Sequence, residues 1–443
     1  MKLTFVLPAI GKKPGQKYIG TWKMEPLTIA VLNALTPQDI ERELFDDRIE
    51  LIDYDSKTDL VAITVETYTA RRGYQIAAEF RKRGVPVVLG GYHVSLLPEE
   101  AARQADCIFT GNAEKVWGQL LQDFQDNKLK KVYNGGIAFT DILPDKSIFT
   151  GKKYLPVSLV ETGRGCCHCC EFCAIAGYYQ GVYYKRDHKQ IVSDLVDSPH
   201  KYHFLVDDNL MADCANARAL FEKITPLRKK WAGQGTLAMA QDQELLRKMK
   251  KSGCEIILIG FESLEEESLR QMNKSWSAAI GERNELVKKI HAAGIGIYAT
   301  FVFGYDGDTP QTFEKTVEFA EKNNFYTAAF NHLLPFPGTL LYQRLMEEGR
   351  LLYDQWWLAE DYNYGELAFK PRHMAAGQLS SYCRQARKEF SRLPVLLSRG
   401  FSSLKRSSPL LWALFWAMNL RLGEEIDEKI NVPLGRNLDE MPK

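Results

Sequence analysis

The chain has 443 residues, a formal net charge of +1, 45% hydrophobic residues and 26% charged residues. This length accommodates about three domains with cores of their own, and the composition is that of a globular protein rather than a disordered one. The near-zero net charge and the lack of a long lysine and arginine run give no electrostatic indication of a nucleic-acid partner.

The beginning of the chain predicts a β-strand rather than a targeting segment. MKLTFVLPAIGKKPG has a short apolar stretch that ends at Pro8, unlike a signal peptide. No apolar run in the sequence reaches the roughly 18 to 20 residues that span a membrane. We therefore expect a cytoplasmic protein whose cysteines are reduced and available as ligands.

Residues 1–145 are expected to form a Rossmann-like domain with a parallel sheet. The apolar runs are KLTFVLPA, IELIDYD, DLVAITVET, VPVVLGG and ADCIFTG, and the helical stretch TARRGYQIAAEFRKRG follows the third. Such alternation is typical of a parallel sheet with helices on both faces. Ligands bind at the carboxyl ends of these strands, where the chain has Gly90, Gly91, Tyr92 and His93. The glycines also fit a purely structural role in strand-to-helix turns.

Residues 146–345 are expected to form a partial (β/α)6 barrel. Six apolar runs follow one another, namely PVSLVET, YHFLVDD, GTLAMAQ, EIILIGFES, IGIYATFVFGYDG and AAFNHLLPFPGT. The helical stretches DQELLRKMKKSG and NELVKKIHAAG lie between them and end in glycine, a common helix stop. Catalytic groups of such barrels lie at the carboxyl ends of the strands, and a cysteine-rich loop follows the first strand here.

Residues 346–443 are expected to form a helical C-terminal domain. The region opens with the aromatic stretch LLYDQWWLAEDYNYGELAFKPRHM and later contains PLLWALFWAMNLRL. The second stretch is strongly apolar but too short to span a bilayer. We expect a buried or substrate-facing helix there, with contact to a membrane surface as the alternative.

The cysteine-rich loop predicts a metal centre. Cys166, Cys170 and Cys173 have C-x3-C-x2-C spacing, and Cys167 and Cys169 lie among them. Structural zinc usually needs a second pair of ligands, which the sequence lacks, and a disulfide does not suit a reducing compartment. A thioredoxin-type CxxC is formally present but opens no helix of a thioredoxin-like unit. Three thiolates can hold three irons of a [4Fe–4S] cluster and leave the fourth iron open.

Further stretches accompany this loop at the predicted strand ends. They are VDDN (206–209), GFES (260–263), FGYDGDT (303–309) and PFPGT (335–339), with GGYHVSLLPEE in the first domain and WWLAEDYNYGELAFKPRHM (356–374) after the barrel. Together with C-x3-C-x-Phe-C they resemble the radical S-adenosylmethionine (SAM) superfamily, and within it the cobalamin-dependent branch of class B radical methyltransferases. The resemblance extends from residue 1 to about residue 375.

The resemblance implies a [4Fe–4S] cluster held by Cys166, Cys170 and Cys173, with SAM bound to the open iron. Cys167 and Cys169 are expected only to fill the loop. The residues that the resemblance suggests as SAM contacts are Asp207, Asp208, Glu262 and Ser263, with Asn209, Gln241 and Asp306 as weaker candidates. One of the two aspartates could instead cap the following helix. Arg164 and Arg372 either bind a carboxylate or pair with surface acids, and Tyr178 and Tyr179 fit packing as well as function.

Cobalamin is expected from the resemblance of the first domain, with Gly90, Gly91, Tyr92 and His93 as candidate contacts. The D-x-H-x-x-G loop whose histidine ligates cobalt in cobalamin-dependent mutases is absent. His93 does not replace that histidine by context, and a hydrogen-bonding or packing role suits it better. Members of this branch often lack the loop, so cobalamin remains an expectation from resemblance alone.

The expected activity is methylation of an unactivated carbon by way of a 5′-deoxyadenosyl radical and methylcobalamin. The apolar C-terminal region suggests a hydrophobic substrate, either lipid-like or a tetrapyrrole, and the chemistry requires an external low-potential electron donor. One alternative is a radical SAM enzyme that catalyses cyclisation, oxidation or carbon–carbon coupling without methyl transfer. A second alternative is a non-catalytic electron-transfer or metal-sensing protein. The sequence indicates no catalytic residue beyond the cofactor contacts.

Overall fold

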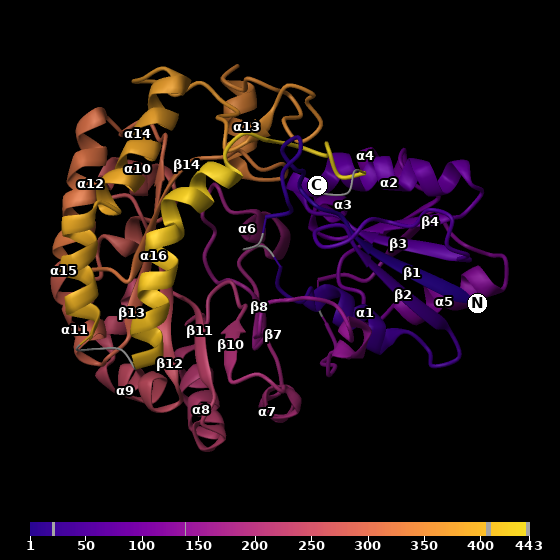
Figure 1. The fold of residues 1–443 in the computed structure, drawn as a ribbon, viewed down its shortest axis with the longest axis horizontal. Helices are drawn as coiled ribbons and strands as arrows, with labels where there is room; N and C mark the ends of the chain where they lie inside the picture. The colour runs from indigo at the N-terminus through magenta and orange to yellow at the C-terminus, as the bar shows by residue number, and fades with distance from the viewer. Residues whose placement is uncertain (20–22, 138, 405–408, 440–443) are drawn as a thin grey trace.

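The computed structural model describes residues 1–19, 23–137, 139–404 and 409–439. Two six-stranded parallel sheets, one in the N-terminal third of the chain and one in its middle, form the framework (Figure 1). Helices from the C-terminal region are packed beside the second sheet. The predicted fold class is therefore confirmed, while the boundaries at residues 145 and 345 stay a prediction.

The first sheet has the strand order β2-β1-β3-β4-β5-β6, and each pair is parallel. The strands are β1 (Lys2–Leu7), β2 (Glu41–Asp46), β3 (Leu60–Thr64), β4 (Val87–Gly90), β5 (Cys107–Thr110) and β6 (Val132–Asn134). Helix α2 (Ala70–Lys82) packs on one face, whereas α1 (Leu27–Leu35) and α5 (Trp117–Gln125) pack on the other. Two short helices, α3 (Tyr92–Leu96) and α4 (Pro98–Ala102), follow β4. Burial on both faces explains the continuous apolar runs of these strands.

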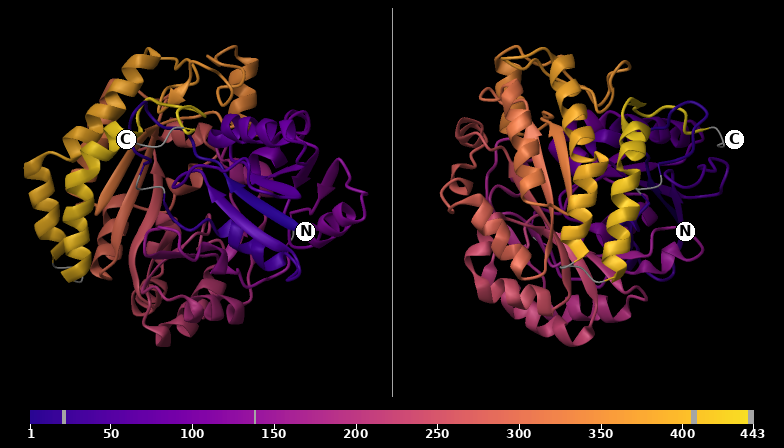
Figure 2. Two further views of the ribbon diagram at one scale, coloured as in Figure 1. Left: turned by 45° about the vertical axis from the view of Figure 1, so that its right-hand side comes forward. Right: turned by 60° about the vertical axis from the view of Figure 1, so that its left-hand side comes forward.

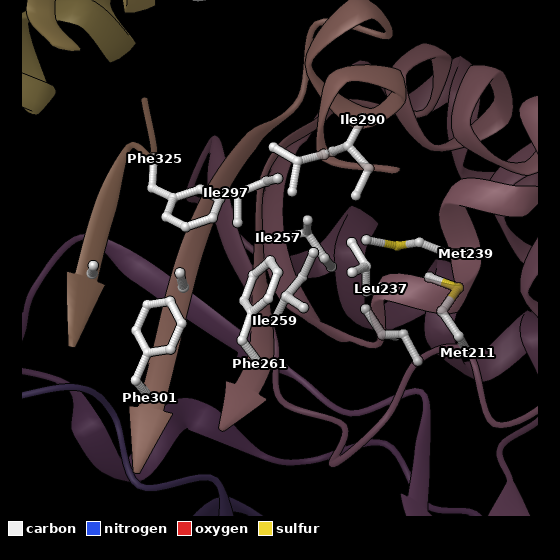
Figure 3. Packing of buried hydrophobic residues seen from close by; sticks show 14 of the residues in the cluster. Met211, Leu237, Met239, Ile257, Ile259, Phe261, Ile290, Ile297, Phe301 and Phe325 are labelled. Atoms are coloured by element: carbon white, nitrogen blue, oxygen red, sulfur yellow. The ribbon is translucent and has the colours of Figure 1, made fainter. Parts of the chain in front are cut away.

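The second sheet has the strand order β14-β13-β12-β11-β10-β7, again all parallel. The strands are β7 (Val157–Val160), β10 (Tyr202–Leu205), β11 (Lys230–Gly235), β12 (Cys254–Glu262), β13 (Gly296–Phe303) and β14 (Thr327–His332). The helices between or after them are α7 (His188–Asp197), α8 (Cys214–Ile224), α9 (Gln243–Lys251), α10 (Glu266–Gln271), α11 (Arg283–Ala292), α12 (Pro310–Lys322) and α13 (Leu340–Glu347). Figure 3 shows Ile257, Ile259 and Phe261 of β12 packed among neighbouring apolar side chains. This is the six-stranded partial barrel expected from the sequence.

Three local predictions differ from the structure. The second strand is ERELFD rather than IELIDYD, because β2 is an edge strand whose partly exposed face tolerates charged residues. The third barrel strand is KWAGQG, and most of GTLAMAQ forms a 3-10 helix (Leu237–Gln241) with buried apolar side chains. Residues 351–374 are mostly irregular, and helices resume with α14 (Ala376–Phe390).

The C-terminal helices cover the free edge of the second sheet. Helices α14, α15 (Leu393–Leu404) and α16 (Pro409–Lys429) lie along β14 (Figure 2). Arg387 donates to the carbonyl oxygen of Phe330 at 2.9 Å, and Arg399 and Asn419 donate to the carbonyl oxygen of Tyr326 at 3.4 and 3.2 Å. Because these donors occupy carbonyls that a further strand would use, the edge is closed to strand pairing.

The end of the chain returns to the first sheet domain. Strand β16 (Val432–Pro433) pairs with β15 (Asn363–Tyr364), and the amide of Gly435 donates to the carbonyl oxygen of Ile10 at 2.7 Å. Asp439 then reaches Arg72 at 2.8 Å. Among the described residues, no helix combines the length and apolar composition needed to cross a membrane.

Candidate active site

The cysteine loop lies between a short hairpin strand and a short helix. Cys166 directly follows β8 (Gly163–Gly165), which pairs with β9 (Tyr183–Lys185), and Cys173 is the N-cap residue of α6 (Ala174–Tyr179). The side chains of Cys166, Cys170 and Cys173 are half-buried, whereas those of Cys167 and Cys169 are exposed. The loop thus distinguishes the three cysteines of the predicted spacing from the other two.

The surroundings of the three half-buried thiols favour a cation beside them. The pKa of Cys170 is raised to about 12, chiefly by burial; the nearby Lys274 opposes the rise, and Cys173 and Cys166 add to it. Asn209 Nδ2 donates to Cys166 Sγ at 3.7 Å. Thiols of this kind become thiolates when a metal centre supplies the compensating positive charge.

The arrangement of the donors fits a cluster better than a single ion. Within the described residues, no three His, Cys, Asp or Glu side chains converge to hold one metal ion. In an iron–sulfur cluster each thiolate binds a different iron, so the sulfurs surround a core of several atoms. Three thiols on one loop match that requirement and fall short of the four ligands of structural zinc.

The two predicted aspartates, which follow the end of β10, have different contacts. Both carboxylate oxygens of Asp207 accept hydrogen bonds from Thr162, one from its amide and one from its hydroxyl, each at 2.6 Å. Asp208 instead accepts from the amide of Gly165 at 3.0 Å and lines the large cavity described below. Burial raises the pKa of Asp207 to about 7 and that of Asp208 to about 6. Asp207 therefore fixes the β7–β8 corner, and Asp208 is the one available to a ligand.

The end of β12 holds a strained and charge-paired glutamate. Glu262 has a φ of +60° beside a register shift in the β12–β13 pairing. Its Oε1 lies 2.9 Å from Lys274 Nζ, which also donates to the carbonyl oxygen of Gly260 at 2.9 Å. Ser263 Oγ accepts from the amide of Glu265. A positive φ at a non-glycine residue such as Glu262 occurs often at functional sites. Its partner Lys274 was not among the candidates from the sequence.

Gln241, Asp306 and Arg372 are occupied by structural contacts. Gln241 Nε2 donates to the carbonyl oxygen of Ile280 at 2.7 Å, near the protein surface. Asp306 forms ion pairs with Arg350 and Arg372, each at 3.0 Å. None of the three lines the large cavity. The structure therefore gives Arg372 the alternative role that the sequence left open, pairing with an acid.

A cavity of about 740 Å³ lies between the carboxyl ends of the first sheet and the two segments that flank the cysteine loop, β8 and α6. The first domain contributes Gly90, Gly91 and Tyr92 to its wall, and the second contributes Arg164, Tyr178, Tyr179 and Asp208. The rings of Tyr92 and Tyr178 meet edge to face at a centroid distance of 5.1 Å. The predicted Rossmann-type strand ends and the α6 region thus share one cavity.

The four residues of the GGYH stretch have different surroundings. Gly91 has a φ of +109°, and a Cβ there would lie 2.6 Å from the carbonyl oxygen of Val65, so only glycine fits. His93 is fully buried, with Nε2 3.0 Å from Glu100 Oε1 and Nδ1 3.4 Å from Thr67 Oγ1. His93 does not line the cavity, and its contacts agree with the hydrogen-bonding or packing role that its sequence context favours, while its role as a cofactor contact stays a prediction.

Two of the glutamates that line the cavity, none of which was a candidate from the sequence, pair with the same arginine. Arg164 pairs with Glu114 at 2.6 Å and with Glu161 at 2.8 Å, and both glutamates line the cavity. Glu114 is almost fully buried, and its second oxygen, Oε2, has no hydrogen-bond partner among the described residues. The available signal was their position, since Glu114 follows β5 and Glu161 follows β7 at carboxyl ends of strands.

Comparisons with known proteins agree with this architecture. Residues 160–320 match the model of the radical SAM superfamily. Bacteriochlorophyllide d C-8(2)-methyltransferase of Chlorobaculum tepidum is 31% identical over 78% of this chain and 80% of its own length. The anaerobic magnesium-protoporphyrin IX monomethyl ester cyclase of Cereibacter sphaeroides is 25% identical over 72% of this chain and 57% of its own length.

A solved structure shows the same fold over nearly the whole chain. The radical SAM methyltransferase TsrM from Kitasatospora setae superposes with a TM-score of 0.68 and 16% identity, over 97% of this chain and 99% of that one. Its agreement supports the pairing of a Rossmann-like domain with a partial barrel. Taken with the sequence match to the methyltransferase of Chlorobaculum tepidum, these findings show that the chain belongs to the radical SAM superfamily, in the group that contains this methyltransferase.

Proposed function

We propose that this enzyme methylates an unactivated carbon of a hydrophobic small molecule, with a tetrapyrrole as the first candidate. The observation that carries the proposal is the cavity between the Gly90–Tyr92 strand end and the segments that flank the cysteine loop, β8 and α6. A cofactor bound by the first domain and a substrate approaching the barrel would meet there. The named activities of the methyltransferase and cyclase relatives, both on tetrapyrroles, support the substrate class.

The residues present suit the three cofactors of this branch. When bound, the cluster and SAM supply a 5′-deoxyadenosyl radical, and cobalamin carries the methyl group. Cys166, Cys170 and Cys173 would hold the cluster, and Asp208 and Glu262 would orient SAM at the carboxyl ends of β10 and β12. Gly90 and Gly91 line the cavity, and their lack of side chains would leave room there for a corrinoid.

The aromatic wall of the cavity would keep water from the radical. Tyr92, Tyr178 and Tyr179 present large rings at the boundary between the two domains. Exclusion of water prevents side reactions of reactive intermediates. The ion pair between Arg164 and Glu114 would hold β8, the strand that leads into the cysteine loop, against the first domain.

The proposal includes the cellular setting. We place the enzyme in the cytoplasm, because a reducing compartment preserves the thiols of the cysteine loop. It would depend on an external low-potential electron donor. Nothing in its balanced charge favours nucleic acid as a partner.

The experiment begins with anaerobic purification, cluster reconstitution and addition of hydroxocobalamin, followed by iron and corrinoid counts. The loaded enzyme is then incubated with dithionite, SAM carrying a deuterated methyl group, and bacteriochlorophyllide or magnesium-porphyrin acceptors. Deuterium in the product supports methyl transfer. Formation of 5′-deoxyadenosine with an altered but unlabelled product would favour the second candidate, ring formation or oxidation, for which the cyclase relative argues.

A further inference from the structure

Helix α15 exposes a row of large apolar side chains. Leu393, Leu397, Phe401 and Leu404 are 61%, 42%, 64% and 50% exposed. Their spacing of four, four and three residues places them on one side of the helix. The opposite side, which includes Leu396, is buried. An apolar row of this kind on the outer side of a helix indicates a surface that contacts something other than water.

Helix α16 continues this surface. It packs beside α15, where Trp412 Nε1 donates to the carbonyl oxygen of Gly400 at 2.9 Å (Figure 2). Leu414 and Met418 are exposed on one side of it, and Leu420 is exposed on another side. We call the exposed apolar residues Leu393, Leu397, Phe401, Leu404, Leu414 and Met418 the hairpin face.

The hairpin face is attached at the end of the barrel opposite the cysteine loop. The buried sides of α15 and α16 pack on Tyr326, just before β14, and on Ile256 near the start of β12. The candidate active site lies at the carboxyl ends of the same parallel sheet. A nine-residue strand such as β12 spans about 30 Å, so the two regions are separated by roughly that distance.

A basic groove lies at the same end of the barrel. The groove, of about 580 Å³, is formed by α9 and α11, and its charged residues are Arg247, Lys250, Lys251 and Lys289, with no carboxylate in its wall. Arg247, Lys251 and Lys289 form no ion pair with any described residue. Figure 1 shows the adjoining ends of α15 and α16 at the same end of the molecule as α9 and α11.

The segment that contains α15 and most of α16 has basic residues but no acidic ones. Residues 391–422 contain five lysines and arginines and no aspartate or glutamate. The acidic residues of α16 come only afterwards, from Glu424 onward. Arg399 is buried and Arg392 pairs with Glu321, so most of the outward positive charge at this end of the molecule comes from the basic groove. An apolar helix surface without carboxylates, with a basic groove at the same end of the molecule, suits the interface of an anionic bilayer.

We propose that the hairpin face and the basic groove together dock the enzyme on the surface of an anionic lipid bilayer. The apolar side chains enter the headgroup region, and the lysines and arginines attract the lipid charge. The described helices do not have the length and composition to span the bilayer, so the contact is peripheral. This proposal stands independently of the proposed function, because it uses no residue of the candidate active site.

The test is flotation of the reconstituted full chain with two kinds of vesicle, phosphatidylcholine alone and phosphatidylcholine mixed with phosphatidylglycerol. We expect binding to the mixed vesicles only, weakened by salt. The R247E/K251E/K289E variant should bind on the order of 100-fold more weakly, the effect expected of three basic residues at an anionic surface. A F401S/L404S variant should bind roughly tenfold more weakly, because less apolar area enters the interface.

The matched control is K57E/K128E/K131E, which changes the net charge equally at exposed lysines of the first domain. It should bind as the unchanged protein does, and all variants should retain the same iron content. The proposal is wrong if neither vesicle is bound, if both are bound equally, or if the control loses binding as strongly. A concentration-dependent dimer that F401S/L404S abolishes would also overturn it, since the face would then be an interface between copies.

Discussion

The buried ion pair between Arg72 and Asp47 gives a sharp test of how the first domain is held together. Arg72 Nε and Nη2 lie 2.9 and 3.0 Å from the two carboxylate oxygens of Asp47, and both side chains are almost fully buried. Asp439, from the end of the chain, binds the same guanidinium at 2.8 Å but is 70% exposed. Replacing Arg72 by methionine would leave the Asp47 carboxylate buried without a counter-charge.

We expect R72M to destabilise the first domain by about 3–5 kcal/mol, the usual cost of an uncompensated buried charge. The exposed pair is worth about 0–1 kcal/mol, so D439N should have little effect. Hydrogen exchange of β1 and β3 peptides measures the opening of this sheet locally, which suits a chain of several domains. Protection in R72M should fall on the order of 100- to 1000-fold.

The pH dependence distinguishes charge from lost packing. Burial already raises the pKa of Asp47, and removal of Arg72 raises it further. A folded-state pKa above the unfolded value means that stability is lost as the pH rises toward the folded pKa. The cost of R72M should therefore be larger at pH 8 than at pH 5. A double variant, D47N/R72M, should cost less than R72M alone; an equal cost in the two would refute the reasoning.

Three further outcomes are expected. G91A should lose corrinoid binding and about 1–3 kcal/mol of stability, because the new Cβ would lie 2.6 Å from a backbone oxygen. G90A should retain both, because a Cβ there would have no contact below 3.6 Å. Equal corrinoid binding by the two variants in a titration would contradict this prediction. C170S should lose cluster iron by iron assay and electron paramagnetic resonance, whereas C169S should keep it. Burial raises the pKa of Asp308 to about 6. The protonated form should therefore contribute about 3 kcal/mol of stability, which is lost as the pH rises from about 4 to about 6. Thermal melts over this pH range measure the loss, and the stability of D308N should not depend on pH in this way.

The parts of the fold that could be predicted are those set by strong local patterns. Buried parallel strands such as β12 read as continuous apolar runs, and the C-x3-C-x2-C spacing lies on a single loop. Strand β2 was missed because one face of an edge strand can be charged, and β11 because its Gly and Gln residues hide a strand that is held by its neighbours. In both cases tertiary context decides the conformation.

The finer assignments at the site depended on long-range contacts. Asp207 and Asp208 are adjacent and chemically identical, yet the first is held by Thr162 while the second lines the cavity. No local pattern distinguishes them, since the partner is 45 residues away. His93 was named with its neighbours because it follows two glycines, but Glu100 and Thr67 hold it inside the domain.

The return of the chain end to the first domain has a consequence for the order of events during synthesis. Gly435 binds Ile10, which lines the cavity, and β16 pairs with the strand that carries Tyr364, another residue of the cavity wall. A nascent chain emerges from the ribosome N-terminus first, and its early domains fold before the rest is made. The wall of the cavity would consequently remain incomplete until residues 432–435 have been synthesised, so binding of a cofactor there would follow the folding of the early domains.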